Sequence, residues 1–221
     1  KSWLQTGWRI GHQHPCADDI DDVEAFIVRT IKRNYIACVR VPTQSHSRYS
    51  ILYSHPNASD LSDHVIGVPS LIDVASGYGI SSGHASESNQ KADIRAIYDI
   101  SQLRPFICST TAGVILQAPP TSVLRVLLWE RACFKKPFSN NTCCADRFSI
   151  YDRISEIQVP VLVIHGEDDR KVPIAHGRAV CEKAVNRVAP LWLRATHDNI
   201  ENCSATWIRI RNFYETVRLC P

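Results

Sequence analysis

The segment VLVIHGEDDRKVP, residues 161–173, decides the fold class of this 221-residue chain. Four apolar residues lead into His165 and Gly166, three acidic residues follow directly, and the segment closes on Pro173. A short apolar run of this kind is typical of a strand that is buried on both faces of a parallel sheet. In an open α/β sheet, functional groups gather in the loops after the C-terminal ends of the strands. The acidic cluster therefore marks a candidate functional site.

A histidine follows the next apolar run along the chain. The run LWLRAT, residues 191–196, predicts a second strand, and His197 comes directly after it. An aspartate at a neighbouring strand end can hold a histidine in one tautomer and stabilise its protonated form, as a general base requires. We therefore predict that Asp169 and His197 lie within hydrogen-bonding distance. The alternative is a solvated acidic turn beside an unrelated surface histidine, because both features are common.

Strand and helix patterns alternate along the rest of the chain. Apolar and polar residues alternate in AFIVRTIKRNYIACVRV, residues 25–41, on both sides of a Lys-Arg-Asn turn, which predicts a β-hairpin. Further strands are predicted in YSILYSHPN, SLIDVASGYG and AGVILQAP, and helices in SESNQKADIRAIYDISQL, IAHGRAVCEKAV and TWIRIRNFYETVRL. In the last helix, Trp207, Ile210, Tyr214 and Val217 share one face. This order predicts an α/β fold with a mostly parallel sheet, helices on both of its faces and an N-terminal hairpin.

The composition argues against several classes of protein. Hydrophobic residues make up 44% of the chain, and 25 basic and 22 acidic residues are spread along its length, so no nucleic-acid partner is predicted. No run approaches the roughly 18 apolar residues of a membrane span, which predicts a soluble cytoplasmic protein. The nine cysteines include no C-x-x-C pair, so we expect reduced thiols, no bound metal and no cofactor. The length predicts one domain over residues 20–221, after a poorly ordered N-terminal segment, residues 1–19.

Several separate blocks of the sequence, in the right order, resemble one family. The blocks VPVLVIHGEDDRKVPIAHG, PLWLRATHDNIE, YSILYSHPNASDL and SGYGISSG are similar to alpha/beta hydrolase domain-containing protein 17, a group of serine hydrolases that remove palmitate from cysteine thioesters. The resemblance runs from about Ile20 to the C-terminus. It implies an α/β-hydrolase fold and S-acylated proteins as substrates. It also implies action at the cytoplasmic face of membranes, although the family's acylated N-terminal cysteine cluster has no counterpart ahead of Cys16 and only peripheral membrane contact stays open.

The resemblance also implies roles for individual residues. Asp169 takes the position of the triad acid and His197 that of the triad base. The backbone N–H of Asn57 takes part in the oxyanion hole, which binds the negatively charged oxygen of the intermediate. Where the family has His-Gly-Asn, however, this chain has His55-Pro56-Asn57, and proline restricts both its own φ and the residue before it. We therefore expect a misaligned oxyanion hole.

The nucleophile is the difficult part of the assignment. Residues 79–83, Gly-Ile-Ser-Ser-Gly, match the G-x-S-x-G pattern literally and nominate Ser81 as the nucleophile. A nucleophile elbow is a sharp turn directly between a strand and a helix. Here the apolar run before it stops at Ala75, and the next helix is predicted to begin only near Ser86 or Ser88. The resemblance also assigns this stretch to a loop over the site, so Ser81 remains a weak candidate.

The family's own elbow would fall between Leu103 and Ala112. Only RPFICSTT lies there, and a strand of about 5 residues followed by a helix of about 11 cannot fit into it. We therefore predict that one internal strand, the Gly-Gln-Ser-Ile-Gly elbow of the family and the helix after it are missing. Ser109 and Thr110 remain as hydroxyls in that space, without a flanking glycine.

Three functions stay open. The first is a serine hydrolase that cleaves palmitoyl thioesters on protein cysteines. The second is a catalytically inactive, truncated relative, or a splice or gene-model variant, that lacks the nucleophile serine. The third is a secreted glycoprotein, which the patterns at Asn57, Asn140 and Asn202 suggest.

Overall fold

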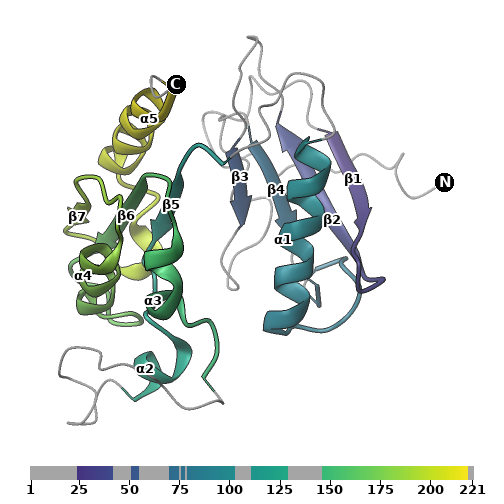
Figure 1. Cartoon of the computed structure of the whole chain (residues 1–221), viewed down its shortest axis with the longest axis horizontal. Coiled ribbons are helices and arrows are strands. Elements are labelled where there is room, and N and C mark those ends of the chain that lie inside the picture. Colours follow the sequence, from purple (N-terminus) through teal and green to yellow (C-terminus); the bar gives the residue numbers. More distant parts are fainter. Residues whose placement is uncertain are drawn as a thin grey trace. The chain divides into compact units, whose positions relative to one another are not determined.

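The computed structural model describes residues 24–41, 51–54, 70–74, 76–77, 79–102, 111–128 and 146–218. The predicted N-terminal segment, residues 1–19, lies outside them. The elements are β1 (Glu24–Arg29), β2 (Tyr35–Val41), β3 (Ile51–Ser54), β4 (Ser70–Val74), α1 (Glu87–Gln102), β5 (Val114–Gln117), α2 (Val123–Leu127), α3 (Ile150–Arg153), η4 (Ile154–Glu156), β6 (Val161–Gly166), α4 (Ile174–Lys183), β7 (Leu191–Leu193), η5 (His197–Asn199) and α5 (Ser204–Arg218). They belong to two compact units, Lys1–Ser109 and Thr110–Pro221, which follow each other along the colour scale of Figure 1.

The first unit contains a mixed four-stranded sheet in the order β1-β2-β4-β3. β1 and β2 form the predicted hairpin, in a register that pairs Arg29 with Tyr35. Its turn is closed by two hydrogen bonds of 2.9 Å, from the Thr30 N–H to the Asn34 carbonyl and from the Arg33 N–H to the Thr30 carbonyl. β4 runs antiparallel to β2 and parallel to β3. The hairpin prediction is therefore confirmed.

Helix α1 covers one face of this sheet (Figure 1). The alternation in β1 places Val28 on that face, and Ile36 and Cys38 of β2 join it there. Ala96 and Ile97 of α1 close the same hydrophobic cluster. Ile36 and Ile97 are fully buried, so this cluster is the core of the first unit.

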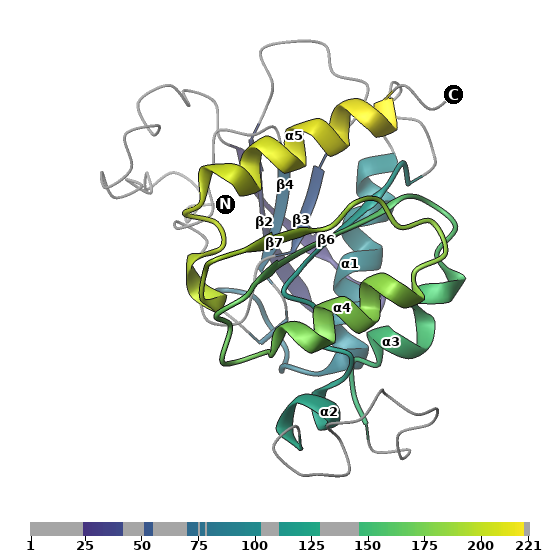
Figure 2. The ribbon, with the colours of Figure 1, turned by 90° about the vertical axis from the view of Figure 1, so that its left-hand side faces the viewer.

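The second unit is built on a parallel three-stranded sheet in the order β5-β6-β7. All six residues of the central strand β6 are buried, which explains its continuous apolar run. In Figure 2, α4 and α5 lie on opposite sides of β6 and β7. Alternate side chains of β6 enter two cores, one containing α5 residues and one containing α4 residues. The first core consists of Ala118, Leu162, Ile164, Ala195, Ile200, Phe213 and Val217, and the second of Ile154, Val161, Val163, Val180, Cys181 and Ala184.

The predicted fold class is confirmed, with two differences in detail. The described strands form two sheets instead of one, in which β3 and β5 are edge strands among the described residues. In α5, the buried positions include Thr206 and Phe213, whereas Trp207 and Tyr214 are only partly buried. Val217 of the predicted face is buried and Ile210 packs against the core, so the covered side of α5 overlaps the predicted face and also takes in Thr206 and Phe213.

Candidate active site

The acidic cluster after β6 folds into a tight turn. The main-chain N–H of Asp169 donates to the carbonyl of Gly166 across 3.4 Å. The Asp169 oxygen Oδ1 then accepts hydrogen bonds from the main-chain N–H groups of Lys171, at 2.9 Å, and Val172, at 2.8 Å. Such side-chain to main-chain bonds are typical of aspartate in turns. They fix the carboxylate at the strand end and lead the chain through Pro173 into α4.

A close contact between Gly166 and Ala195 brings the loop after β7 to the Asp169 turn. A Cβ atom on Gly166 would lie 2.2 Å from the carbonyl oxygen of Ala195, so only glycine fits here. The N–H groups of Glu167 and Asp168 donate to the carbonyls of Leu193, at 2.6 Å, and Ala195, at 3.2 Å. The two loops are therefore hydrogen-bonded beyond the end of the sheet, and the residues after Ala195 follow the Asp169 turn.

Asp169 and His197 form the predicted hydrogen-bonded pair. His197 begins the short helix η5, and its Nδ1 lies 2.7 Å from Oδ2 of Asp169. The carboxylate side chain is fully buried, whereas the imidazole is 28% exposed. A buried carboxylate beside Nδ1 favours the tautomer with its proton on that atom and fixes the orientation of the ring. The pair thus has the geometry of a triad acid and its base, and the geometric prediction is confirmed.

His165 supports the same carboxylate from inside the sheet. Its side chain is fully buried, and its Nε2 lies 2.8 Å from the Val172 carbonyl and 3.5 Å from Asp169 Oδ2. Burial lowers the pKa of His165, which favours the neutral ring with the proton on Nε2. A Cβ atom on Gly177 would lie 2.3 Å from His165 Nδ1, so α4 can pass over the ring only with glycine at this position.

A second buried histidine was missed by the sequence reasoning. His176 of α4 is fully buried, and its Nδ1 lies 2.8 Å from the hydroxyl of Thr121, which is also fully buried. Burial, with a smaller contribution from the Arg125 cation, lowers the pKa of His176 to about 4. The available signal was a histidine in the first turns of an otherwise apolar helix face, and that pattern does not distinguish a buried residue from an exposed one.

The remaining acidic residues near the turn are solvent-facing. Glu167 and Asp168 are exposed. Asp198 is exposed and pairs with the Lys171 ammonium across 2.6 Å, and this hydrogen bond lowers the pKa of Asp198. Only Asp169 of the acidic cluster is buried, so the alternative of a wholly solvated turn does not hold.

Ser81 lies in the first unit, in the loop between β4 and α1. Its hydroxyl accepts a hydrogen bond of 3.0 Å from the main-chain N–H of Ala37, and the hydroxyl of Ser82 accepts one of 2.7 Å from the N–H of Tyr35. β4 ends at Val74 and α1 begins at Glu87, so residues 75–86 separate the strand from the helix. Ser81 is therefore not on a strand-to-helix elbow. Asn57, Ser109 and Thr110 lie outside the described residues.

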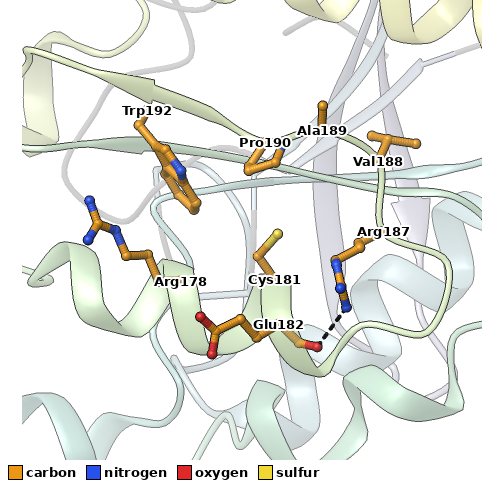
Figure 3. Close-up of a pocket in the computed structure, with 8 residues that line it drawn as sticks. All are labelled: Arg178, Cys181, Glu182, Arg187, Val188, Ala189, Pro190 and Trp192. Carbon is orange, nitrogen blue, oxygen red and sulfur yellow. Dashed lines mark hydrogen bonds between the residues drawn. The ribbon is translucent and has the colours of Figure 1, made fainter.

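A shallow pocket lies apart from the histidine–aspartate pair. It has a volume of about 350 Å³ and lies between α4 and the segment that enters β7 (Figure 3). Arg178 stacks over the Trp192 ring at 5.9 Å, and Arg187 donates to the Glu182 carbonyl at 3.0 Å. Neither Asp169 nor His197 lines this pocket. Within the described ranges, no group of three or more metal-ligating side chains comes together, and no helix has the length and apolar character needed to cross a membrane.

Solved structures show which class of fold this is. An esterase of Pyrococcus furiosus superimposes with a TM-score of 0.67 at 14% identity, over 93% of this chain and 96% of that chain. The esterase RhEst1 of Rhodococcus gives a TM-score of 0.60 at 13% identity, over 87% of this chain and 99% of that chain. The chain therefore has the α/β-hydrolase fold.

Sequence similarity to curated proteins identifies the family. Alpha/beta hydrolase domain-containing protein 17C of Mus musculus is 34% identical over 227 residues, which cover 88% of this chain and 68% of the relative. Alpha/beta hydrolase domain-containing protein 17B of Homo sapiens is 35% identical over 225 residues, 87% of this chain and 75% of the relative. No family model matches the chain. The chain belongs to the alpha/beta hydrolase domain-containing protein 17 family of serine hydrolases, as the sequence blocks predicted.

Proposed function

We propose that this chain carries the acid and base of a serine hydrolase that cleaves palmitoyl thioesters on protein cysteines, and that it lacks the turn that would carry the nucleophile. The observation that supports the acid and base is the 2.7 Å contact between His197 Nδ1 and Asp169 Oδ2 at neighbouring strand ends. The short connection between α1 and β5 supports the loss of the nucleophile turn. The chain as given would then hydrolyse acyl thioesters at no appreciable rate.

The chemistry assigns His197 a defined task. In a serine hydrolase, a serine oxygen attacks the thioester carbonyl carbon while the histidine takes the hydroxyl proton. The carbon–sulfur bond then breaks, the proton passes to the leaving thiolate, and water hydrolyses the acyl-enzyme by the same route. Because Asp169 holds Nδ1, the ring's Nε2 is the atom that would move the proton. Within the described ranges, Nε2 of His197 has no hydrogen-bond partner, which leaves it available for this task.

Two observations support the loss of the elbow. α1 ends at Gln102 and β5 begins at Val114, so only residues 103–113 lie between them. That length is too short for a strand, an elbow and a helix, which together need roughly 20 residues. In addition, the match to the mouse relative spans 227 positions, more than the whole chain, although it covers only 88% of the chain. The alignment therefore contains positions at which the relative has residues and this chain has none.

Ser81 is a poor substitute for the missing nucleophile. Its hydroxyl accepts the Ala37 N–H, and the loop that carries it is tied down at Ser76, whose N–H and hydroxyl donate to the buried Asp93 carboxylate at 2.7 and 2.8 Å. A serine that must leave such contacts lacks the pre-positioning that lowers the barrier by several kcal/mol. Any rate through Ser81 would therefore be lower by orders of magnitude.

An inactive relative that still binds an acyl chain or an S-acylated protein is the second candidate. The same missing segment favours it, because loss of the nucleophile removes chemistry before it removes binding. The third candidate, a secreted glycoprotein, is not favoured by Cys181 and Cys203, which are free thiols.

The direct test is turnover of a palmitoyl-thioester substrate by the purified chain, with the human 17B relative as the positive control. Ser81→Ala and His197→Ala variants, and labelling by a fluorophosphonate probe, show whether any serine is activated. We expect no appreciable turnover and no labelling. Robust turnover that both substitutions abolish would overturn the proposal and make Ser81 the nucleophile. Sequencing of the transcript across residues 103–112 would show whether the missing segment is absent from the natural message.

A second consequence of the missing strand is association. β3 and β5 are edge strands among the described residues, and unpaired edges template contacts between chains. We expect poor solubility or concentration-dependent oligomers in size-exclusion chromatography. A monomer that unfolds cooperatively would contradict the predicted deletion.

A further inference from the structure

Among the described residues of the first unit, the most exposed large hydrophobic side chains lie at one hairpin and the loop beside it, whereas Ile94 of α1, at 44%, is less exposed. Ile27, Ile31 and Tyr35 are 58%, 79% and 51% exposed. Ile80 is 70% exposed and lies in the loop whose Ser82 is hydrogen-bonded to Tyr35. Large apolar side chains gathered in this way, and not scattered singly, mark a surface that binds something.

The same hairpin concentrates positive charge. Residues 24–41 contain four basic residues, Arg29, Arg33, Arg40 and Lys32, and one acidic residue, Glu24. This excess of three equals the formal net charge of the whole chain, which is +3, so the rest of the chain is balanced. The sequence pattern indicated an even spread of charge and therefore no partner. Pairing of β1 with β2 brings these charges together on one hairpin.

The backbone places the basic and apolar groups side by side. Arg29 lies opposite Tyr35 in the ladder, with its guanidinium 5.9 Å from the centre of the Tyr35 ring. Ile27 shares the outer face of β1 with Arg29, away from the core that α1 covers. Ile31, Lys32 and Arg33 form the turn itself, where Arg33 has a φ of 66°, a conformation that favours glycine or asparagine. We define the basic hairpin tip as Ile27, Arg29, Ile31, Lys32, Arg33 and Tyr35.

The charges of the tip are not neutralised within the described residues. Arg29, Lys32 and Arg33 form no ion pair there, and the Lys32 ammonium bonds only to the neutral hydroxyl of Ser88, at 2.5 Å. Isoleucine side chains offer nothing to the bases or phosphates of a nucleic acid. Apolar and aromatic side chains flanked by cations match the interface of an anionic bilayer, in which the apolar groups enter the acyl boundary and the cations meet the headgroups.

We propose that the basic hairpin tip docks on the surface of an anionic lipid bilayer. The contact is peripheral and reversible, since three cations and a few apolar side chains supply a moderate affinity. This contact uses none of the residues assigned to catalysis, so a test of lipid binding does not depend on whether the proposed hydrolase site is correct.

The experiment is flotation of the full chain with vesicles, because protein that aggregates does not float. Vesicles of phosphatidylcholine alone are compared with vesicles that also contain phosphatidylserine. We expect flotation only with the anionic vesicles, and less of it as the salt concentration rises. The double variant Lys32→Glu, Arg33→Glu should reduce the bound fraction roughly tenfold or more, and Ile31→Ser should reduce it about tenfold.

Matched controls lie in the second unit. Ile208→Ser removes an isoleucine that is 60% exposed on α5, and the double variant Arg194→Glu, Arg211→Glu makes the same change of charge at exposed positions. Both should float like the unsubstituted chain. Equal flotation with neutral vesicles, or equal losses from the controls and the tip variants, would overturn the proposal. So would tip substitutions that shift the oligomer size without lipid and leave flotation unchanged, because the tip would then contact a second copy of the chain.

Discussion

Two buried carboxylates, Asp93 in the first unit and Asp169 in the second, show what distinguishes a structural acid from one placed for chemistry. Each is almost completely inaccessible, at 0% and 6% exposed, and each accepts hydrogen bonds from main-chain N–H groups. Both oxygens of Asp93 bond to Ser76 and so hold a loop. Asp169 holds its loop with Oδ1 and directs Oδ2 at the partly exposed ring of His197.

The difference teaches that neither burial nor satisfied hydrogen bonds identify a catalytic carboxylate. The useful criterion is that one oxygen faces a titratable group with access to solvent. Ser81 fails the equivalent criterion for a nucleophile, because its hydroxyl accepts a hydrogen bond from the main-chain N–H of Ala37 in β2 and lies on a loop instead of a strand-to-helix elbow.

The largest expected effects come from removing the two carboxylates. Asp169→Ala leaves the N–H groups of Lys171 and Val172 and the His197 ring without their acceptor, and should lower the free energy of unfolding by about 4 kcal/mol. Asp93→Ala leaves the N–H and the hydroxyl of the buried Ser76 without their acceptor, and should lower the free energy of unfolding by about 3 kcal/mol. Denaturant unfolding, with hydrogen exchange in β6 and β2, assigns each loss to its unit. The far-downfield proton resonance of the His197–Asp169 hydrogen bond should vanish only in Asp169→Ala; its loss in Asp93→Ala as well would erase the distinction.

The second expected effect is acid destabilisation of the second unit. His176 has its pKa lowered from 6.5 to about 4, so below pH 6.5 the unfolded chain binds a proton that the folded chain does not. This contribution to stability is complete above pH 6.5 and is lost as the pH falls towards 4, by up to about 3 kcal/mol. His176→Gln should flatten the profile of unfolding free energy against pH in this window. His84→Gln, which changes an exposed histidine of the first unit, serves as the control, and an unchanged slope in His176→Gln would refute the assignment.

A smaller effect is expected from Gly166, which brings together the loops that carry Asp169 and His197. The Cβ of Gly166→Ala would meet the Ala195 carbonyl, which is main chain and cannot rotate away, so we expect a loss of about 2 kcal/mol. The same measurement on Gly83→Ala tests the other loop, where φ is +90° and the added Cβ would meet the movable Asn34 side chain. We expect about 1 kcal/mol there. Only Gly166→Ala should also broaden or shift the His197 proton resonance.

The smallest effect is expected from the exposed ion pair that links the loop of Asp169 to the loop of His197. Lys171 and Asp198 lie 2.6 Å apart, with 58% and 63% of their side chains exposed. Exposed ion pairs contribute little because water and salt screen them. Lys171→Met and Asp198→Asn should therefore leave the melting temperature unchanged within error. A clear drop in either variant, at physiological salt, would show that this pair and not the Asp169 turn holds the loops together.

The sequence alone was sufficient for the features that depend on local pattern and on chemistry at strand ends. The apolar run 161–164 predicted β6, alternation on both sides of Lys32-Arg33-Asn34 predicted the hairpin, and Asp169 and His197 were paired from their positions after two strands. Spacing also separated Ser81 from a true elbow, because an elbow leaves no room between strand and helix. These inferences succeed because periodicity and chain length constrain the backbone directly.

The remaining features depend on contacts between residues far apart in the chain, which no local pattern encodes. Packing between separate elements accounts for three of them. These are the burial of His176 against Thr121, the close contact of Gly166 with Ala195, and the burial of Phe213 of α5 in the core. The same holds for the basic hairpin tip, whose charges look evenly spread until β1 and β2 pair. Local propensity sets which elements form, but long-range packing decides which of their side chains meet, because the free energy of burial is gained only when the elements come together.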